Sequence, residues 1–233
     1  MRDTVLTELL GALREKRPAV MATRIPGGDQ ALLFPMDADV EAPAGEWPME
    51  AAHQALLDDR SVTVADAAGD VFLRPYNPPV RVVVVGAVHI AAPLAQLSAV
   101  TGLEVHVVDP RTAFATEERF PGVHLVDAWP EEAFAELRPD HRTAVVTLTH
   151  DAKLDDPALL GALATPAFYI GALGSRRTHE KRLARLREQG VSEADLARIN
   201  APVGLDIGAR TPPEIAVAIL AELVAHLRGA EPS

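Results

Sequence analysis

The sequence predicts an α/β fold, with a Rossmann-like parallel sheet in its second part and a small α+β domain before it. Residues 82 to 85 are four valines in a row, followed by Gly86. Such a run is typical of a parallel strand that is buried on both faces. After residue 80, expected strands alternate with expected helices, which is the pattern of a parallel sheet with helices on both faces.

The first 75 residues are expected to form the small α+β domain. Its first helix is predicted by apolar residues at helical spacing, and its strands by two short hairpin patterns. The turn of the first hairpin is the PGGD segment, and an acidic loop with prolines follows over residues 37–46. The expected elements are a helix over residues 4–16, strands over 19–25 and 31–36, a helix over 48–57, and strands over 61–65 and 71–74.

The prolines of the PYNPP segment separate this domain from the next one. Proline continues neither a helix nor a central strand. We therefore expect a small domain over 1–75, a linker over 76–80, a Rossmann-like domain over 81–228 and a tail over 229–233. The expected strands of the second domain are 81–85, 104–108, 123–126, 144–148 and 167–170, and its expected helices are 91–100, 130–137, 157–164, 178–189 and 211–227.

Composition excludes several classes of protein. The net charge of −11 argues against a partner such as nucleic acid or an anionic membrane. The absence of cysteine removes disulfides, thiolate metal sites and cysteine nucleophiles. No stretch approaches the roughly 18 apolar residues of a membrane span, and the first residues lack a signal-peptide pattern. A cytoplasmic protein is therefore expected.

The first βα turn of the second domain resembles a dinucleotide-binding turn, with one serious departure. Asp109 follows Gly86 by 23 residues, close to the spacing of roughly 20 at which an acidic side chain meets a ribose hydroxyl. In the G-x-G-x-x-G pattern, however, Val88 and Ala91 stand at the second and third glycine positions. A nucleotide-binding unit and a purely structural βαβ unit both remain open at this point.

Ligands of such sheets bind beyond the carboxyl ends of the strands, at the point where the strand order reverses. The segments after four strands carry unusual residues. They are GAVH, DPR, THD and GALGSRR, which supply the candidate binding residues Gly86, His89, Asp109, Arg111, Gly171, Gly174, Ser175, Arg176 and Arg177.

The GALGSRR segment is the strongest candidate for an anion site. Its glycines permit close backbone approach, and a helix start offers free N–H groups. Six Arg or Lys residues against one Glu fill residues 176–187, so like charges repel along this helix. A solvated basic face that pairs with surface carboxylates is the alternative for the later residues.

Two further loops supply weaker candidates. His150 has the acid–base chemistry for neutral pH, and Asp151 could orient it. Asp156 is expected to cap a helix that opens at Pro157. Asp206 and Gly208 lie in a bent loop ahead of a helix that a capping box starts at residue 211. The dispersed histidines predict no zinc site, and no metal site is assigned.

The motifs of the second domain resemble one family. GAVHIAAPLA, VVDPRTAFATEERFP, LTHDAKLDDPAL, FYIGALGSRRTHEKRL and PVGLDIGARTPPEIAVAILAE, in this order and spacing, are similar to the carboxyl-terminal domain of the XdhC/CoxF family. The resemblance covers about residues 79–227. It implies a Rossmann fold and an accessory protein that binds molybdenum cofactor, promotes its sulfuration and delivers it to a molybdenum hydroxylase apoenzyme of the xanthine dehydrogenase type.

The amino-terminal part departs from the family pattern. The family usually carries a GSSPR-like and a GGC-containing segment there, and this chain has IPGGD and an acidic loop instead. Without cysteine, a role of a family cysteine in holding molybdenum or sulfur is not available. The chain is then either a divergent maturation factor or a relative that has kept the fold and lost cofactor handling.

The leading hypothesis is a cytoplasmic, dimeric factor whose cargo is molybdopterin or its dinucleotide form. Gly86 and His89 would shape the first turn, Asp109 and Arg111 would contact the nucleotide or pterin, and residues 174–177 would hold phosphate. Its expected partners are a molybdenum hydroxylase apoenzyme and, as a second candidate, a cysteine desulfurase. The alternatives are an NAD(P)-dependent oxidoreductase with His150 as proton donor, and a docking protein without a ligand.

Overall fold

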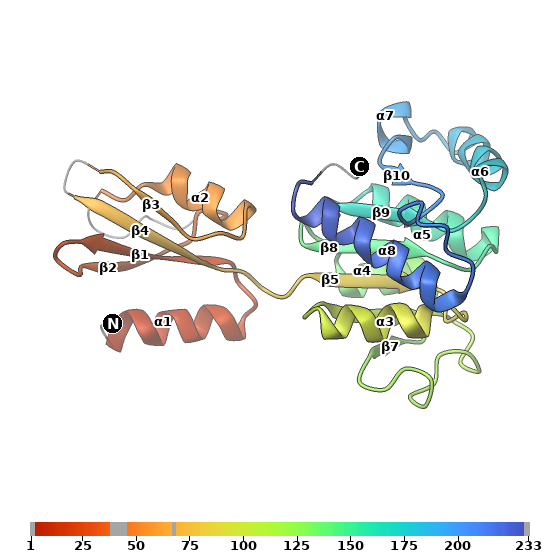
Figure 1. Cartoon of the computed structure of the whole chain (residues 1–233), viewed down its shortest axis with the longest axis horizontal. Coiled ribbons are helices and arrows are strands. Elements are labelled where there is room, and N and C mark those ends of the chain that lie inside the picture. The colour runs from red at the N-terminus through yellow and green to blue at the C-terminus, as the bar shows by residue number, and fades with distance from the viewer. Residues whose placement is uncertain (1–2, 38–45, 67–68, 231–233) are drawn as a thin grey trace. The chain divides into compact units, whose positions relative to one another are not determined.

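The computed structural model describes residues 3–37, 46–66 and 69–230 (Figure 1). The chain divides into two compact units, Met1–Pro78 and Pro79–Ser233. Each unit has a sheet and a core of its own. Most of the acidic loop expected over residues 37–46 lies outside the described residues, as does the end of the expected tail.

The first unit is a four-stranded antiparallel sheet with strand order β2-β1-β4-β3 and one helix on each face. Its elements are α1 (Asp3–Arg14), β1 (Ala19–Ile25), β2 (Gln30–Leu33), α2 (Met49–Leu57), β3 (Val62–Val64) and β4 (Asp70–Tyr76). Successive side chains of β1 point to opposite faces, so Val20 and Ala22 pack with α2 while Ala19 and Met21 pack with α1. The sheet is therefore covered on both sides.

The second unit is a six-stranded parallel sheet with strand order β10-β9-β8-β5-β6-β7. The predicted α/β class with a Rossmann-like sheet is confirmed. Its elements are β5 (Arg81–Val85), α3 (Ala91–Val100), β6 (Glu104–Val108), β7 (His124–Val126), α4 (Pro130–Leu137), β8 (Thr143–Thr147), α5 (Ala152–Leu163), β9 (Tyr169–Ala172), α6 (Arg176–Glu188), α7 (Glu193–Leu196), β10 (Ile199–Asn200) and α8 (Pro212–Leu227).

The four valines of β5 explain why this strand lies at the centre of the second unit. Val82 and Val84 pack with α3 and α8 on one face of the sheet, and Val83 and Val85 pack with α4 and α5 on the other. All four are fully buried. Figure 1 shows α3 and α8 side by side on the near face of this sheet.

Several element boundaries differ from the expected ones: β2 ends at Leu33, β4 runs to Tyr76 into the expected linker, and α6 begins at Arg176. Helix α5 begins at Ala152 and not at Pro157, because Asp151 caps it by accepting a hydrogen bond from the N–H of Lys153 at 3.0 Å. Asp156 is therefore inside α5, and so is Pro157. Strand β9 extends to Ala172, two residues later than expected, which places Gly171 within the strand. The short elements α7 and β10 are absent from the expected set.

Candidate functional site

The strand order reverses between β5 and β8, so the loops after these two strands flank the expected ligand crevice. Gly86 ends β5 with a φ of +106°, a conformation that favours glycine. A Cβ on Gly86 would lie 2.3 Å from Cγ2 of Thr149, the residue that follows β8 by two positions. Gly86 is thus required because Thr149 packs directly on it.

The start of α3 is a poor anion site. Ile90 occupies the N-cap position without a side-chain hydrogen bond, and Pro93 in the first turn has no N–H to donate. Val88, which replaces the second glycine of the dinucleotide pattern, packs partly buried against the core. His89 is exposed beside it. This turn therefore offers a ligand less than a dinucleotide-binding turn does.

Asp109 is occupied by protein groups on both carboxylate oxygens. It is fully buried at the end of β6 and accepts a hydrogen bond from the N–H of Ala87 at 2.8 Å. Arg111 donates from Nε to Oδ1 and from Nη2 to Oδ2, both at 2.8 Å, and its N–H donates to Oδ1 at 2.9 Å. A ribose hydroxyl would have to displace these donors.

These contacts also fix the charge of Asp109. Burial opposes ionisation of Asp109, but the Arg111 side chain and the N–H groups of Ala87 and Arg111 outweigh it, so the pKa of Asp109 is lowered. The guanidinium of Arg111 also lies over the ring of Phe114, with its carbon 4.7 Å from the ring centre. Arg111 is therefore held between a carboxylate and an aromatic ring.

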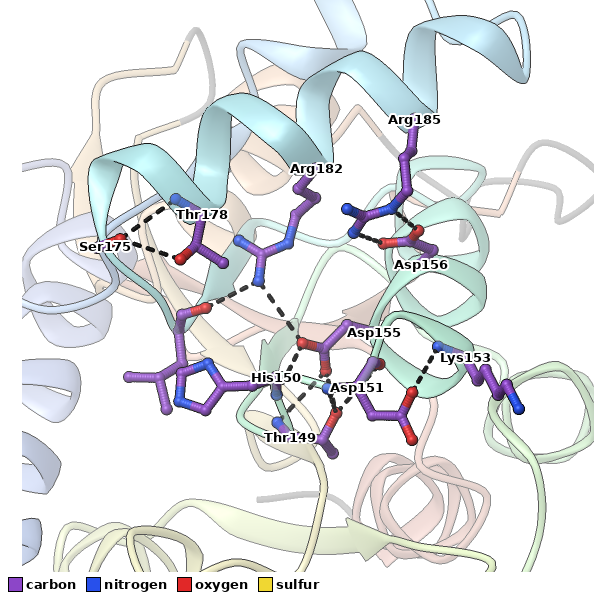
Figure 2. Close-up of polar contacts among 11 residues, drawn as sticks. Thr149, His150, Asp151, Lys153, Asp155, Asp156, Ser175, Thr178, Arg182 and Arg185 are labelled. Atoms are coloured by element: carbon purple, nitrogen blue, oxygen red, sulfur yellow. Dashed lines mark hydrogen bonds and ion pairs between the residues drawn. The ribbon is translucent and has the colours of Figure 1, made fainter.

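The loop after β8 is organised by Asp155, which is buried in the first turn of α5. Oδ1 of Asp155 accepts a hydrogen bond from the hydroxyl of Thr149 at 2.7 Å, and Oδ2 accepts one from the N–H of His150 at 3.1 Å (Figure 2). His150 itself is exposed, with a φ of +63° that few non-glycine residues adopt. Asp155 holds this unusual backbone in place.

Asp151 does not orient His150, the role that its position in the sequence suggests. Its carboxylate caps α5 at the N–H of Lys153. Among the described residues, no hydrogen bond joins the Asp151 and His150 side chains. The geometry gives no support to a catalytic acid–base pair at these two positions.

A buried ion pair connects α5 to α6. Nη2 of Arg182 lies 3.6 Å from Oδ2 of Asp155, and both side chains are only 2 % exposed. Nη2 also donates to the backbone carbonyl of Leu173 at 2.8 Å (Figure 2). Burial raises the pKa of Asp155 despite the hydrogen bonds from Thr149 and the charge of Arg182. Burial likewise lowers the pKa of Arg182. The two charges compensate each other incompletely.

The start of α6 combines a capped turn with exposed cations. The hydroxyl of Ser175 accepts a hydrogen bond from the N–H of Thr178 at 3.2 Å, so Ser175 is the N-cap of α6. Arg176 and Arg177 follow in the first turn and are exposed. Within the described ranges, neither guanidinium has a hydrogen-bond or ion-pair partner.

The later cations of α6 are paired. Arg185 makes two hydrogen bonds to Asp156, at 2.5 and 2.8 Å, and Arg187 makes two to Glu193, at 2.5 and 2.9 Å. Arg185 and Arg187 therefore belong to a basic face that pairs with carboxylates, which is the alternative given for the later residues of this helix. The exposed cations at the start of α6 remain as candidates for binding an anion.

The remaining predicted site residues are two glycines on either side of the end of β9 and two exposed residues in the loop before α8. Gly171 is buried in β9, and a Cβ there would lie 2.6 Å from Cγ2 of Val203, so packing requires this glycine. Gly174, with a φ of +141°, forms the turn before α6. Asp206 and Gly208 are exposed in the loop before α8. That loop is fixed at its base, where the N–H of Gly204 donates to Glu222 at 2.8 Å.

Residues 82–223 match the family described as the XdhC Rossmann domain. The chain belongs to the XdhC family. It is 32 % identical over 188 residues to a protein of Bacillus subtilis strain 168 that is named as a probable xanthine dehydrogenase component, an alignment that covers 77 % of this chain and 53 % of that protein. It is 35 % identical over 148 residues to the molybdenum cofactor insertion chaperone PaoD of Escherichia coli K12, covering 64 % of this chain and 40 % of PaoD.

A solved structure shares the XdhC fold. The crystal structure of a protein named xanthine dehydrogenase from Bacillus halodurans matches with a TM-score of 0.72 and 23 % identity, over 97 % of this chain and 64 % of that one. This similarity establishes the fold alone. The chain spans between about a third and two thirds of the length of the relatives that it matches.

The XdhC match contains every loop described above, from Gly86 to the base of α8. Two cavities lie away from these loops, one of about 540 Å³ between α2 and β3 and one of about 200 Å³ near the start of β9, and neither is lined by a predicted site residue. Over residues 3–37, 46–66 and 69–230, no group of three or more His, Asp or Glu side chains could hold a metal ion. Nor is any helix in these ranges long and apolar enough to cross a membrane.

Sequence reasoning misses the buried ion pair of Asp155 and Arg182 in this XdhC domain. The expected helix over 157–164 leaves Asp155 outside it, and Arg182 is counted only as one of six cations in residues 176–187. The signal is present in the spacing: Asp155 and Asp156 are adjacent on α5, and Arg182 and Arg185 lie one turn apart on α6. Two such pairs on neighbouring helices indicate ion pairs between the helices, which is what the structure contains.

Proposed function

We propose that the chain is an accessory protein that binds molybdenum cofactor and assists its insertion into a molybdenum hydroxylase apoenzyme. Membership of the XdhC family carries this proposal, together with the name of the relative PaoD, a molybdenum cofactor insertion chaperone. The cargo is molybdopterin or its dinucleotide form, each of which carries phosphate.

The site proposed for the cofactor is the carboxyl edge of the second unit's sheet. Side chains from three loops meet the requirements of a phosphate-bearing ligand. They are the exposed His89 after β5, the partly exposed Arg111 after β6, and the exposed Arg176 and Arg177 at the start of α6. Cations at a helix start bind phosphate through charge and through free N–H groups together. Asp206 and Gly208 are proposed as outer contacts of the same ligand.

The contacts of Asp109 count against the NAD-dependent alternative. In a dinucleotide site the acidic residue after the second strand accepts a ribose hydroxyl. Here Arg111 and Ala87 fill both oxygens of Asp109, and Pro93 removes a donor from the start of α3. Among the described residues, no hydrogen bond joins the side chains of His150 and Asp151, the catalytic candidates of that alternative, because Asp151 caps α5.

Sulfuration of the cofactor is assigned to a partner. This chain contains no cysteine, so it has no thiol that could carry a persulfide sulfur. We propose that a cysteine desulfurase supplies sulfur while the chain holds the cofactor, that the chain works as a homodimer, and that it does so in the cytoplasm.

Equilibrium binding of isolated molybdenum cofactor to the purified chain tests the proposal, with NAD and NADP measured in parallel. The double variant Arg176→Ala, Arg177→Ala is compared with Arg187→Ala, which removes a cation at the other end of α6. We expect the wild type and Arg187→Ala to bind the cofactor equally well. The double variant is expected to lose about tenfold or more of its affinity for the cofactor.

A second readout examines the delivery step. The loaded chain is mixed with a cofactor-free molybdenum hydroxylase, and the activity gained is compared with that from free cofactor. Binding of NAD or NADP in place of the cofactor would replace this proposal with the oxidoreductase. Failure to bind any of the three ligands would favour the docking protein.

A further inference from the structure

Arg182 is a buried cation whose donors are only partly used. It is 2 % exposed, and its Nη2 alone has partners, the carbonyl of Leu173 and the more distant Asp155. Nε and Nη1 are buried and have no hydrogen-bond partner among the residues that the structure describes. Nδ1 of His179, three residues earlier on α6, is buried and unpartnered in the same way. Buried polar atoms without partners are uncommon and costly, so these donors need an explanation.

The guanidinium is directed at the turn that opens α6. A Cβ placed on Gly174 would lie 3.1 Å from Cγ2 of Thr178 and 3.8 Å from Nη2 of Arg182. The side chains of Thr178 and Arg182 therefore both pack close to Gly174. Figure 2 shows the Arg182 side chain extending from α6 toward Asp155, beside the capped turn of Ser175 and Thr178.

The first turn of α6 is electrostatically unfavourable in the absence of an anion. The helix dipole places partial positive charge at this end, where acidic residues are normally favoured and cations are disfavoured. The turn contains no acidic residue, and it begins with Arg176 and Arg177. Lys181 is exposed four residues after Arg177, so the two like charges repel. Together with Arg182, the chain gathers four cations around one helix start.

Asp155 is a weak counter-ion for this group. Its oxygens are already engaged by the hydroxyl of Thr149 and the N–H of His150, at 2.7 and 3.1 Å, whereas its distance to Arg182 is 3.6 Å. Asp155 thus neutralises Arg182 partly while its hydrogen bonds hold the neighbouring loop. A stronger anion would take the place of Asp155 beside the guanidinium.

We propose that Arg182 and the first turn of α6 form a site for the terminal phosphate of a phosphate monoester, at which the phosphate replaces Asp155 as the counter-ion of Arg182. The inference rests on the proposed function only in placing this phosphate on the cofactor. The proposed site selects molybdopterin as the form of the cargo. Molybdopterin ends in a phosphate monoester, whereas its dinucleotide form has a pyrophosphate with a substituent on both sides.

Burial of the guanidinium explains the preference for a terminal group. The free donors of Arg182, Nε and Nη1, are buried, and a terminal phosphate can present its free oxygens to them. A phosphodiester carries a second substituent, which would also have to be buried beside the guanidinium. Arg176 and Arg177 would contact the outer oxygens of the bound group.

Calorimetric titration of the full chain with inorganic phosphate, glycerol phosphate and dimethyl phosphate tests this inference. The two dianions are expected to bind at least about tenfold more tightly than the diester. Arg182→Met is expected to weaken phosphate binding by at least about tenfold, whereas Arg187→Met, which removes an exposed cation from the same helix, stays within about twofold. Equal binding of monoester and diester, or undiminished binding in Arg182→Met, would overturn the inference.

Asp155→Asn provides a test that does not depend on the folding of Arg182→Met. It keeps an acceptor for Thr149 and removes the internal counter-ion, so phosphate is expected to bind about three- to tenfold more tightly than to the wild type. The melting temperature of Asp155→Asn should fall without phosphate and rise with phosphate by more than that of the wild type. Unchanged or weaker phosphate binding in Asp155→Asn would assign Arg182 a purely structural role.

The same samples separate this inference from the proposed function. A chain that retains molybdenum cofactor but ignores phosphate and the Arg182 substitution keeps the proposed function and overturns the phosphate site. A chain that binds phosphate monoesters as described but retains no cofactor keeps the phosphate site and overturns the proposed function.

Discussion

Replacement of Asp109 by alanine is expected to lower the free energy of unfolding of the second unit by about 2 to 5 kcal/mol. The N–H of Ala87 would lose its acceptor in a fully buried position, at a cost of about 1 to 3 kcal/mol. Loss of the acceptor for the N–H of Arg111 adds about 1 kcal/mol. The side chain of Arg111 is 40 % exposed and regains water, so its lost ion pair adds less than about 1 kcal/mol.

Asp109→Asn separates the hydrogen bonds from the charge. The amide oxygen can still accept from Ala87, so this variant is expected to lose only about 1 to 2 kcal/mol. Because the pKa of Asp109 is lowered in the folded protein, its ionised form stabilises the fold above the ordinary carboxyl range. That contribution is lost as pH falls below about 4, toward the lowered pKa. Asp109→Asn should lack this part of the acid sensitivity.

Urea unfolding followed by tryptophan fluorescence measures these differences. The chain has two tryptophans, and Trp47→Phe leaves Trp129 as the reporter of the second unit. All variants are made in that background and compared at pH 7 and over the acidic range. A loss below about 0.5 kcal/mol in Asp109→Ala, or equal losses in the alanine and asparagine variants, would refute the role given to the buried N–H of Ala87.

Three further predictions concern packing and ion pairs. Asp156→Ala, which removes a half-buried two-point ion pair between α5 and α6, should cost about 1 to 2 kcal/mol in urea unfolding, and Glu193→Ala, on an exposed pair, less than about 0.5. Gly171→Ala should lower the melting temperature through a loss of about 1 to 3 kcal/mol, because its methyl group would overlap Val203, and an unchanged melting temperature would contradict that packing. Residues 79–233 expressed alone should give the circular dichroism and cooperative melting of a folded α/β unit, since they contain their own core; a non-cooperative transition would argue otherwise.

Much of the second unit's fold could be predicted from local patterns. The valine run of β5 and its glycine turn identify a buried parallel strand, and β6, β8 and β9 are visible as apolar segments between turns. The two short elements α7 and β10 have four and two residues, too few for a periodic pattern. The sequence misplaces the start of α5 because Pro157 resembles a first-turn proline, while the cap at Asp151 competes with it.

Prediction of the site goes less far, because side-chain contacts between distant segments decide it. The sequence identifies Asp109 at nucleotide-binding spacing, and nothing in that spacing indicates that Arg111 two residues later would occupy the carboxylate. Ser175 is expected at an anion site, and its hydroxyl proves to cap α6. Which of the cations on α6 are paired depends on how α5 and α6 pack, and that is set by the whole fold.

The two hydrogen bonds from the Arg111 side chain to Asp109 affect which nucleotides can compete for this site inside a cell. Nicotinamide dinucleotides are abundant there, and under the proposed function they would compete with the cofactor if the sheet edge bound them. The carboxylate that selects their ribose is kept in the sequence, yet the chain's own guanidinium occupies it. In a fold that dinucleotide-binding proteins also use, a single neighbouring side chain can thus occupy the carboxylate that would otherwise bind their ribose.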